Sequence, residues 1–99
     1  MSRQRSMEVI AQAAYVTIGE LVRLSDVRYS TLKFYTEEGL LPFEQAGEHL
    51  TRRYPREASL RRIGELRAMR AAGLGIPEIK ARLLEESAAG AAGAGSKAG

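Results

Sequence analysis

Hydrophobic residues recur at helical spacing soon after Tyr15 and predict a first short helix. Its apolar face consists of Ile18, Leu21, Val22 and Leu24, because residues three and four apart share one side of a helix. Thr17 stands before this run and Glu20 three positions later, which is the pattern of an N-terminal capping box. We expect this helix to end near residues 25–26, with the turn at residues 26–27.

A second helix is predicted from about Arg28 to Glu38, with Gly39 in the left-handed conformation that ends many helices. Its inner face is expected to carry Leu32, Phe34 and Tyr35. Its opposite side is polar and carries Tyr29, Ser30 and Lys33. Two short helices joined by a tight turn, the second with a basic and hydroxyl-rich outer side, form a candidate helix-turn-helix.

Between the second helix and Pro55 the pattern favours extended structure. Pro42 disfavours the helical conformation in the residue before it and so ends the helix. Phe43 to Tyr54 predicts a β-hairpin with residues 46–48 at its tip. Successive side chains of a strand point to opposite faces, so only one of Arg52 and Arg53 can readily face a given partner.

Two more helices are predicted after the hairpin. Pro55 suits the first position of a helix that runs to about Ala72. Its buried stripe is expected to be Ala58, Leu60, Ile63, Leu66 and Met69. Pro77 is expected to open a fourth helix, Glu78 to Glu86. The sequence therefore predicts a mainly α fold, a winged helix-turn-helix of four helices with a small β-hairpin wing.

The two ends of the chain differ in composition from the middle. Residues 87–99 are almost all Ala, Gly and Ser and predict a disordered tail or linker. Residues 1–14 are expected to form a flexible or partly helical extension, in which Met7 to Tyr15 offers up to two helical turns. A single domain is then expected over residues 15–86, in keeping with a length of 99 residues.

Composition excludes several classes of function. The chain has no cysteine and one histidine, His49, which argues against disulfides, thiolate catalysis and a metal site built from Cys or His. We expect no metal and no cofactor. It shows no nucleophile–base pair and no glycine-rich phosphate loop after a strand, so we do not expect an enzyme. No apolar run approaches the roughly 18 residues of a membrane span, and a cytoplasmic protein is expected.

Arginine is concentrated in one part of the chain. The formal net charge is only +3, but residues 50–70 hold seven arginines against two glutamates. Clustered arginine indicates a surface that faces phosphate groups. The alternative is a solvated helix face, and it applies above all to Arg61, Arg62, Arg67 and Arg70.

Three blocks of sequence resemble the MerR family of winged-helix bacterial regulators. These blocks are Thr17–Leu21, Thr31–Tyr35 with Glu37–Pro42, and Arg52–Tyr54. The segment from Leu66 to Leu84 is similar to the third and fourth helices of the family. The resemblance covers about Tyr15 to Leu84, which is all of the expected folded core.

The resemblance implies a sequence-specific protein that binds double-stranded DNA and regulates transcription. Helix 28–38 would lie in the major groove, and the wing, residues 43–54, would follow the backbone or the minor groove. The residues implied in contacts are Thr17, Arg28, Tyr29, Ser30, Lys33, Tyr35, Arg52 and Arg53. The first three residues of the helix would reach base edges, whereas Lys33 and Tyr35 would hold phosphates.

Several of these residues also have a plain structural interpretation. Tyr35 is alternatively a packing residue, Lys33 a solvated charge, and Phe34 is expected in the core rather than at DNA. Asp26 and Arg28 replace the glycine-containing turn and hydroxyl cap of the family. Either Asp26 caps the second helix, or the helix starts differently and Arg28 contacts a base. Thr51 stands where the family commonly has an aromatic residue.

The sequence also departs from the family after Glu86, where a long dimerisation helix and an effector region would follow. Three explanations remain open: a domain of a larger regulator, a minimal protein that associates weakly or on DNA, or self-association through Met7 to Tyr15. Two other functions also remain open. One is an excisionase-like architectural protein that bends DNA, and the other is a MerR-like module that binds a protein.

Overall fold

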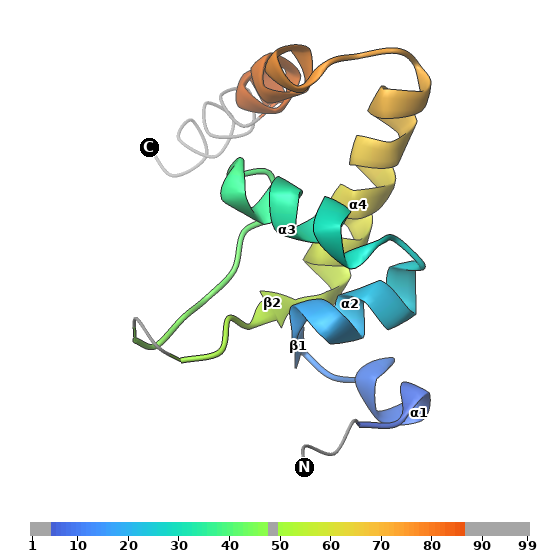
Figure 1. The fold of residues 1–99 in the computed structure, drawn as a ribbon, viewed down its shortest axis with the longest axis vertical. Coiled ribbons are helices and arrows are strands. Elements are labelled where there is room, and N and C mark those ends of the chain that lie inside the picture. The colour runs from blue at the N-terminus through green and yellow to red at the C-terminus, as the bar shows by residue number, and fades with distance from the viewer. Residues whose placement is uncertain (1–4, 48–49, 87–99) are drawn as a thin grey trace, which may run out of the picture. The chain divides into compact units, whose positions relative to one another are not determined.

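A computed structural model describes residues 5–47 and 50–86 of the protein (Figure 1). Its elements are, in chain order, α1 (Met7–Ile10), β1 (Tyr15–Val16), α2 (Ile18–Ser25), α3 (Tyr29–Glu37), β2 (Tyr54–Pro55), α4 (Arg56–Ala71) and a helix over residues 76–86. The predicted class, a mainly α winged helix-turn-helix, is confirmed. The chain divides into two compact units, and the division falls after Glu65, inside α4.

The start of α2 follows the predicted capping box. The Thr17 hydroxyl accepts a hydrogen bond from the Glu20 amide at 3.2 Å, and the Glu20 carboxylate accepts one from the Thr17 amide at 2.9 Å. The helix ends at Asp26, whose φ of 60° is left-handed. Asp26 therefore ends α2 with its backbone. It does not cap α3, whose N-cap is Arg28.

Gly39 ends α3 as predicted, with a φ of 78°. Its amide donates to the Thr36 carbonyl at 3.1 Å, and the Leu40 amide donates to the Tyr35 carbonyl at 2.8 Å. These two bonds form a Schellman motif, which satisfies the last carbonyls of the helix. The motif turns the chain so that Leu40 and Leu41 are both buried.

The core of the first unit draws on every one of its elements. Its buried apolar residues are Ile10, Val16, Leu21, Leu32, Tyr35, Leu40, Leu41, Tyr54 and Ile63. The expectation that Phe34 belongs to this core was wrong, because its side chain is 43% exposed. The reason is helical geometry: Leu32, Tyr35 and Thr36 occupy the inner face of α3, and Phe34 points away from it.

The sheet of the structure joins segments that are far apart in sequence. Tyr15–Val16 pairs antiparallel with Tyr54–Pro55, which places Pro55 in β2 rather than in the following helix. The predicted hairpin over residues 43–54 is reduced to one bridge, in which Glu44 and Arg53 exchange two hydrogen bonds of 2.8 Å. Residues 48–49, and with them His49, lie outside the described part of the chain.

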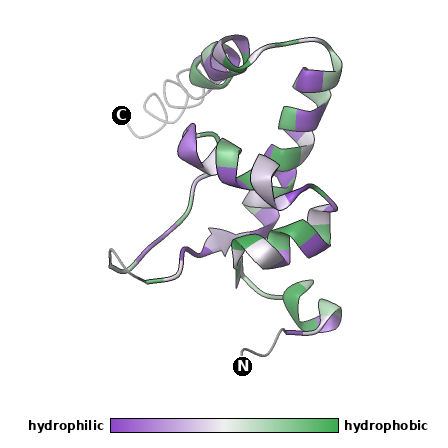
Figure 2. Cartoon of the chain, viewed as in Figure 1, coloured by the Kyte–Doolittle hydropathy of each residue, from purple (hydrophilic) through white to green (hydrophobic). Residues whose placement is uncertain are grey.

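Helix α4 buries only part of the predicted stripe, and it buries one residue outside that stripe. Ser59, Ile63 and Leu66 are buried, whereas Ala58 is exposed and Leu60 and Met69 are half-buried. Hydrophilic and hydrophobic residues alternate along this helix (Figure 2). One buried position of α4 is therefore occupied by a serine. A prediction based on the spacing of apolar residues cannot identify such a position.

Ser59 leads to a prediction about stability. Its side chain is fully buried, and its hydroxyl oxygen has no hydrogen-bond partner among the described residues. Because an unsatisfied buried polar group costs free energy and alanine favours helices, Ser59→Ala is expected to raise the free energy of unfolding by about 1 kcal/mol. Urea unfolding followed by circular dichroism measures this change. A decrease in stability would contradict the prediction.

The second unit contains the end of α4 and the helix over residues 76–86. Gly73 ends α4 with a φ of 92°, while the Leu74 amide donates to the Met69 carbonyl at 3.0 Å. The next helix starts two residues before the predicted Glu78, because the Glu78 carboxylate accepts a hydrogen bond from the Gly75 amide at 2.8 Å and caps the helix. Ile79 is its buried residue.

Candidate nucleic-acid interface

Helix α3 presents a polar and partly basic side to the outside. Arg28, Ser30 and Lys33 are exposed, and Tyr29 is 53% exposed. The side chain of Arg28 makes no capping hydrogen bond within the described part of the chain. The guanidinium therefore sits at the start of α3 without a role in holding the helix, together with a phenol, a hydroxyl and an ammonium group.

The inner side of α3 is fixed to the strand that leads out of the wing. The Thr36 hydroxyl donates to the Leu32 carbonyl at 2.9 Å and lies 2.9 Å from the Tyr54 hydroxyl. Because Thr36 has one hydroxyl hydrogen and gives it to Leu32, Tyr54 is the donor of the second bond. Thr36 and Tyr54 are both buried. We call this contact the hydroxyl link.

Two of the predicted contact residues have structural roles here. Tyr35 is only 6% exposed, so the structure places its ring in the core and not on the outer side of α3. Thr17 is half-buried, and its hydroxyl and amide both take part in the capping box. Neither residue is grouped with Arg28, Ser30 and Lys33 on the outer side of α3.

The two wing arginines stack on different aromatic rings. The guanidinium carbon of Arg52 lies 4.7 Å from the centre of the Phe43 ring, and that of Arg53 lies 5.1 Å from the centre of the Tyr15 ring. A guanidinium over an aromatic ring is attracted by the negative face of the ring, and its planar set of N–H donors is suited to phosphate. The stacked rings thus hold both cations on the wing.

Tyr15 itself is held against the wing. Its hydroxyl donates to the Glu44 carboxylate at 2.8 Å, and this bond raises the pKa of Tyr15 above its usual value. Sequence reasoning missed Tyr15 and Phe43 as parts of the surface. For Phe43 there was a signal in the sequence, because it lies at the start of the predicted hairpin whose other arm carries the two arginines. For Tyr15 the sequence offered only an aromatic residue close to the start of the predicted first helix.

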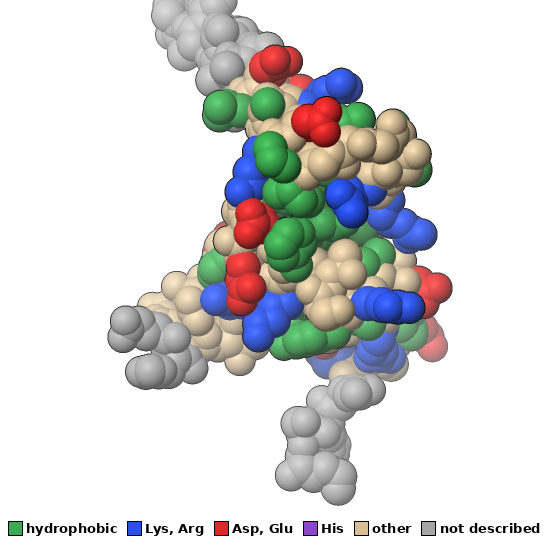
Figure 3. All heavy atoms as spheres, turned by 45° about the horizontal axis from the view of Figure 1, so that its top comes forward, with side chains coloured by type: hydrophobic (Ala, Val, Ile, Leu, Met, Phe, Trp, Pro, Cys, Tyr) green, Lys and Arg blue, Asp and Glu red, His purple; other side chains and the backbone are tan. Residues whose placement is uncertain are grey.

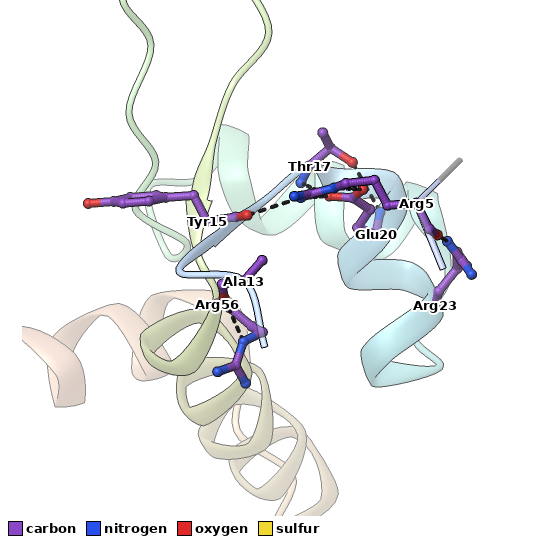
Figure 4. A network of polar contacts seen from close by, with 7 residues as sticks. All are labelled: Arg5, Ala13, Tyr15, Thr17, Glu20, Arg23 and Arg56. Carbon is purple, nitrogen blue, oxygen red and sulfur yellow. Dashed lines mark hydrogen bonds and ion pairs between the residues drawn. The ribbon is translucent and has the colours of Figure 1, made fainter. Parts of the chain in front are cut away.

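Sequence reasoning also missed a network that binds the N-terminal segment to α2 and α4 (Figure 4). Arg5 donates two hydrogen bonds, of 2.7 and 2.8 Å, to the Glu20 carboxylate and a third, of 3.1 Å, to the Tyr15 carbonyl. Arg23 donates to the Arg5 carbonyl at 2.6 Å, and Arg56 donates to the Ala13 carbonyl at 2.7 Å. We call these contacts the N-terminal brace.

The brace changes the electrostatics at the start of α2. The Glu20 side chain is 12% exposed, and its bonds to Arg5, with a further contribution from Thr17, lower its pKa to about 2. Glu20 is therefore ionised and neutralised by a cation that lies 15 residues earlier in the sequence. Ser6, next to Arg5, caps α1 by accepting a hydrogen bond from the Val9 amide.

One face of the molecule combines basic and hydrophobic side chains. Figure 3 shows one face, on which lysine and arginine side chains are interspersed with apolar ones and with fewer acidic ones. Within residues 5–47 and 50–86, no group of three His, Cys, Asp or Glu side chains could hold a metal ion. The helices described in these residues are too short or too polar to cross a membrane.

Comparisons with known proteins agree with this arrangement. The model of the MerR helix-turn-helix family of regulatory proteins matches residues 16–86. The chain is 38% identical over 71 residues to a SoxR homologue of Chromobacterium violaceum, described as a helix-turn-helix transcriptional activator. The match covers 71% of this chain and 46% of that relative, so the chain spans less than half of the relative's length. No solved structure shows a significant match.

Proposed function

The chain belongs to the MerR family of helix-turn-helix regulatory proteins, and we propose that it binds specific sites in double-stranded DNA and regulates transcription. In this proposal α3 lies in the major groove, and the wing lies along the backbone or the minor groove. The observation that carries the proposal is the exposed group of Arg28, Ser30 and Lys33 on an α3 whose other side is fixed to the wing strand.

The proposed roles follow from the chemistry of each side chain. Arg28 and Tyr29 stand at the start of α3, where a helix in the major groove comes closest to base edges. Arginine there can donate two hydrogen bonds to a guanine. Lys33, and whichever of Arg52 and Arg53 faces the duplex, supply contacts to phosphates, which orient the protein on the duplex without selecting a sequence.

Two predicted contacts are modified in this proposal. Tyr35 is only 6% exposed, so its ring is not part of the proposed contact surface. Thr17 has its hydroxyl and amide engaged in the capping box, and it stays in the proposal only as a residue that positions the start of α2. The proposed interface is therefore centred on Arg28, Tyr29 and Lys33, with a phosphate contact from Arg52 or Arg53 on the wing.

Salt dependence of DNA binding tests the proposal. We expect the affinity for a fluorescently labelled mixed-sequence duplex to fall steeply between about 50 and 200 mM salt, because phosphate contacts release counterions. Lys33→Ala is expected to weaken binding to all sequences and to reduce the slope of log affinity against log salt by about 1. Fluorescence anisotropy measures both quantities.

Lys80 provides the matched control. It is an exposed lysine of the helix over residues 76–86 and is not among the proposed contact residues, so Lys80→Ala changes the net charge equally but should leave the slope unchanged. An equal change in slope for the two variants would remove Lys33 from the interface. Absence of wild-type binding at 50 mM salt would overturn the proposed function and favour a protein partner instead.

A further inference from the structure

We propose that Phe34 is a specificity-determining residue that recognises the methyl group of a thymine in the major groove. This inference rests on the proposed function and assigns a role to a side chain that the contacts proposed above do not use. Phe34 is 43% exposed on α3, although its neighbours Leu32 and Tyr35 are buried. An aromatic ring is thus presented to solvent in the middle of the proposed recognition helix.

The position of Phe34 on the helix places it at the centre of the outer face. Ser30 lies four residues before it and Glu37 three residues after it, so the three side chains share one side of α3, and all three are exposed. Leu32, Tyr35 and Thr36 define the opposite, buried side. If Ser30 faces the bases, then Phe34 faces them as well, one helical turn farther along.

The chemistry of the ring restricts what it can bind there. Phenylalanine has no polar hydrogen to donate to a phosphate, and the adjacent Lys33 already supplies a cation. Among the base edges of the major groove, the C5-methyl group of thymine is the apolar feature, and contact with it distinguishes thymine from the other bases. Burying the ring against this methyl group removes apolar surface of both partners from water.

Replacing thymine with deoxyuridine in the DNA tests the inference, because this change removes only the methyl group. A duplex that binds wild type tightly is first selected from a random pool, and each thymine is then replaced in turn. At one position we expect wild type to lose about fourfold in affinity, which corresponds to the roughly 0.8 kcal/mol of one buried methylene-sized group. Phe34→Ala should bind the thymine and deoxyuridine duplexes equally at that position.

Phe43 gives the matched control, since it is also a partly exposed phenylalanine but belongs to the wing. Phe43→Ala should keep the fourfold preference for thymine, even where its total affinity falls through the loss of the ring beneath Arg52. Circular dichroism of Phe34→Ala should match wild type, because the side chain is not part of the core. The double comparison separates methyl recognition from a general loss of binding.

Three results would overturn the inference. The first is a Phe34→Ala variant that folds and keeps the wild-type preference for thymine over deoxyuridine. The second is a wild type that binds DNA specifically but shows no such preference at any position, which would leave the proposed function intact. The third is a wild type that binds no duplex at low salt, which would overturn the proposed function as well.

Discussion

Tyr54→Ala should destabilise the protein by about 3–5 kcal/mol, the range for removing a large buried aromatic side chain. The side chain of Tyr54 is fully buried, its ring centre lies 5.9 Å from that of Phe43, and its hydroxyl completes the hydroxyl link to Thr36. A small domain has roughly 5–15 kcal/mol of stability in total, so this variant should be largely unfolded at moderate temperature. The chain has no tryptophan, and far-ultraviolet circular dichroism is the suitable probe.

Tyr54→Phe separates the hydroxyl from the ring. It keeps the packing but removes the hydrogen bond to Thr36, so we expect a loss of only about 1 kcal/mol. Thr36→Val removes the other partner, and the double variant should lose less than the sum of the two single variants, because the bond can be removed only once. Additive losses would show that the two hydroxyl groups do not interact in solution.

The second large effect concerns acid. Because the folded-state pKa of Glu20 is about 2 and its ordinary value is 4.5, the ionised carboxylate stabilises the folded state above about pH 4.5. This contribution should be lost as the pH falls from about 4.5 to 2, since the folded protein must then take up a proton against the bond to Arg5. Glu20→Gln should cost about 1–2 kcal/mol at pH 7, through loss of a charge-assisted bond and weakening of the capping box.

Urea unfolding between pH 2 and 7 measures this effect. The difference in stability between wild type and Glu20→Gln should shrink toward zero as the pH falls to 2. In Arg5→Ala the pKa of Glu20 should move up toward its ordinary value, and nuclear magnetic resonance of the carboxylate carbon reads this directly. A stability difference between wild type and Glu20→Gln that stays constant from pH 2 to 7 would contradict the lowered pKa of Glu20, and with it the assigned role of Arg5.

Local signals in the sequence were sufficient for both ends of α2 and for the C-terminal ends of α3 and α4. Thr17 and Glu20 mark the start of α2, and Gly39 and Gly73 end α3 and α4, because each acts on backbone groups only a few residues away. The pairing of Tyr15–Val16 with Tyr54–Pro55 carries no such signal. Two-residue strands are too short for an alternating pattern, and the paired residues are 40 and 38 positions apart in the sequence.

The surface residues likewise divide into those that local spacing could place and those whose contacts join distant segments. Tyr29, Ser30 and Lys33 could be placed on the outer side of α3 by helical spacing. Helical spacing places Phe34 opposite Leu32, but its apolar character favoured the inner face, which was wrong. The pairing of Arg5 with Glu20 and of Arg53 with the Tyr15 ring depends on how distant segments meet, which residue pattern alone does not determine.

The hydroxyl link has a consequence for the thermodynamics of binding. Tyr54 follows Arg53 directly, so a bond from Tyr54 to Thr36 sets the spacing between a wing cation and α3 before any partner arrives. The loss of conformational freedom needed to hold these two elements together is then incurred during folding and not during association. A rigid partner can then bind α3 and this part of the wing without first ordering one relative to the other. The same contacts therefore give a higher net affinity.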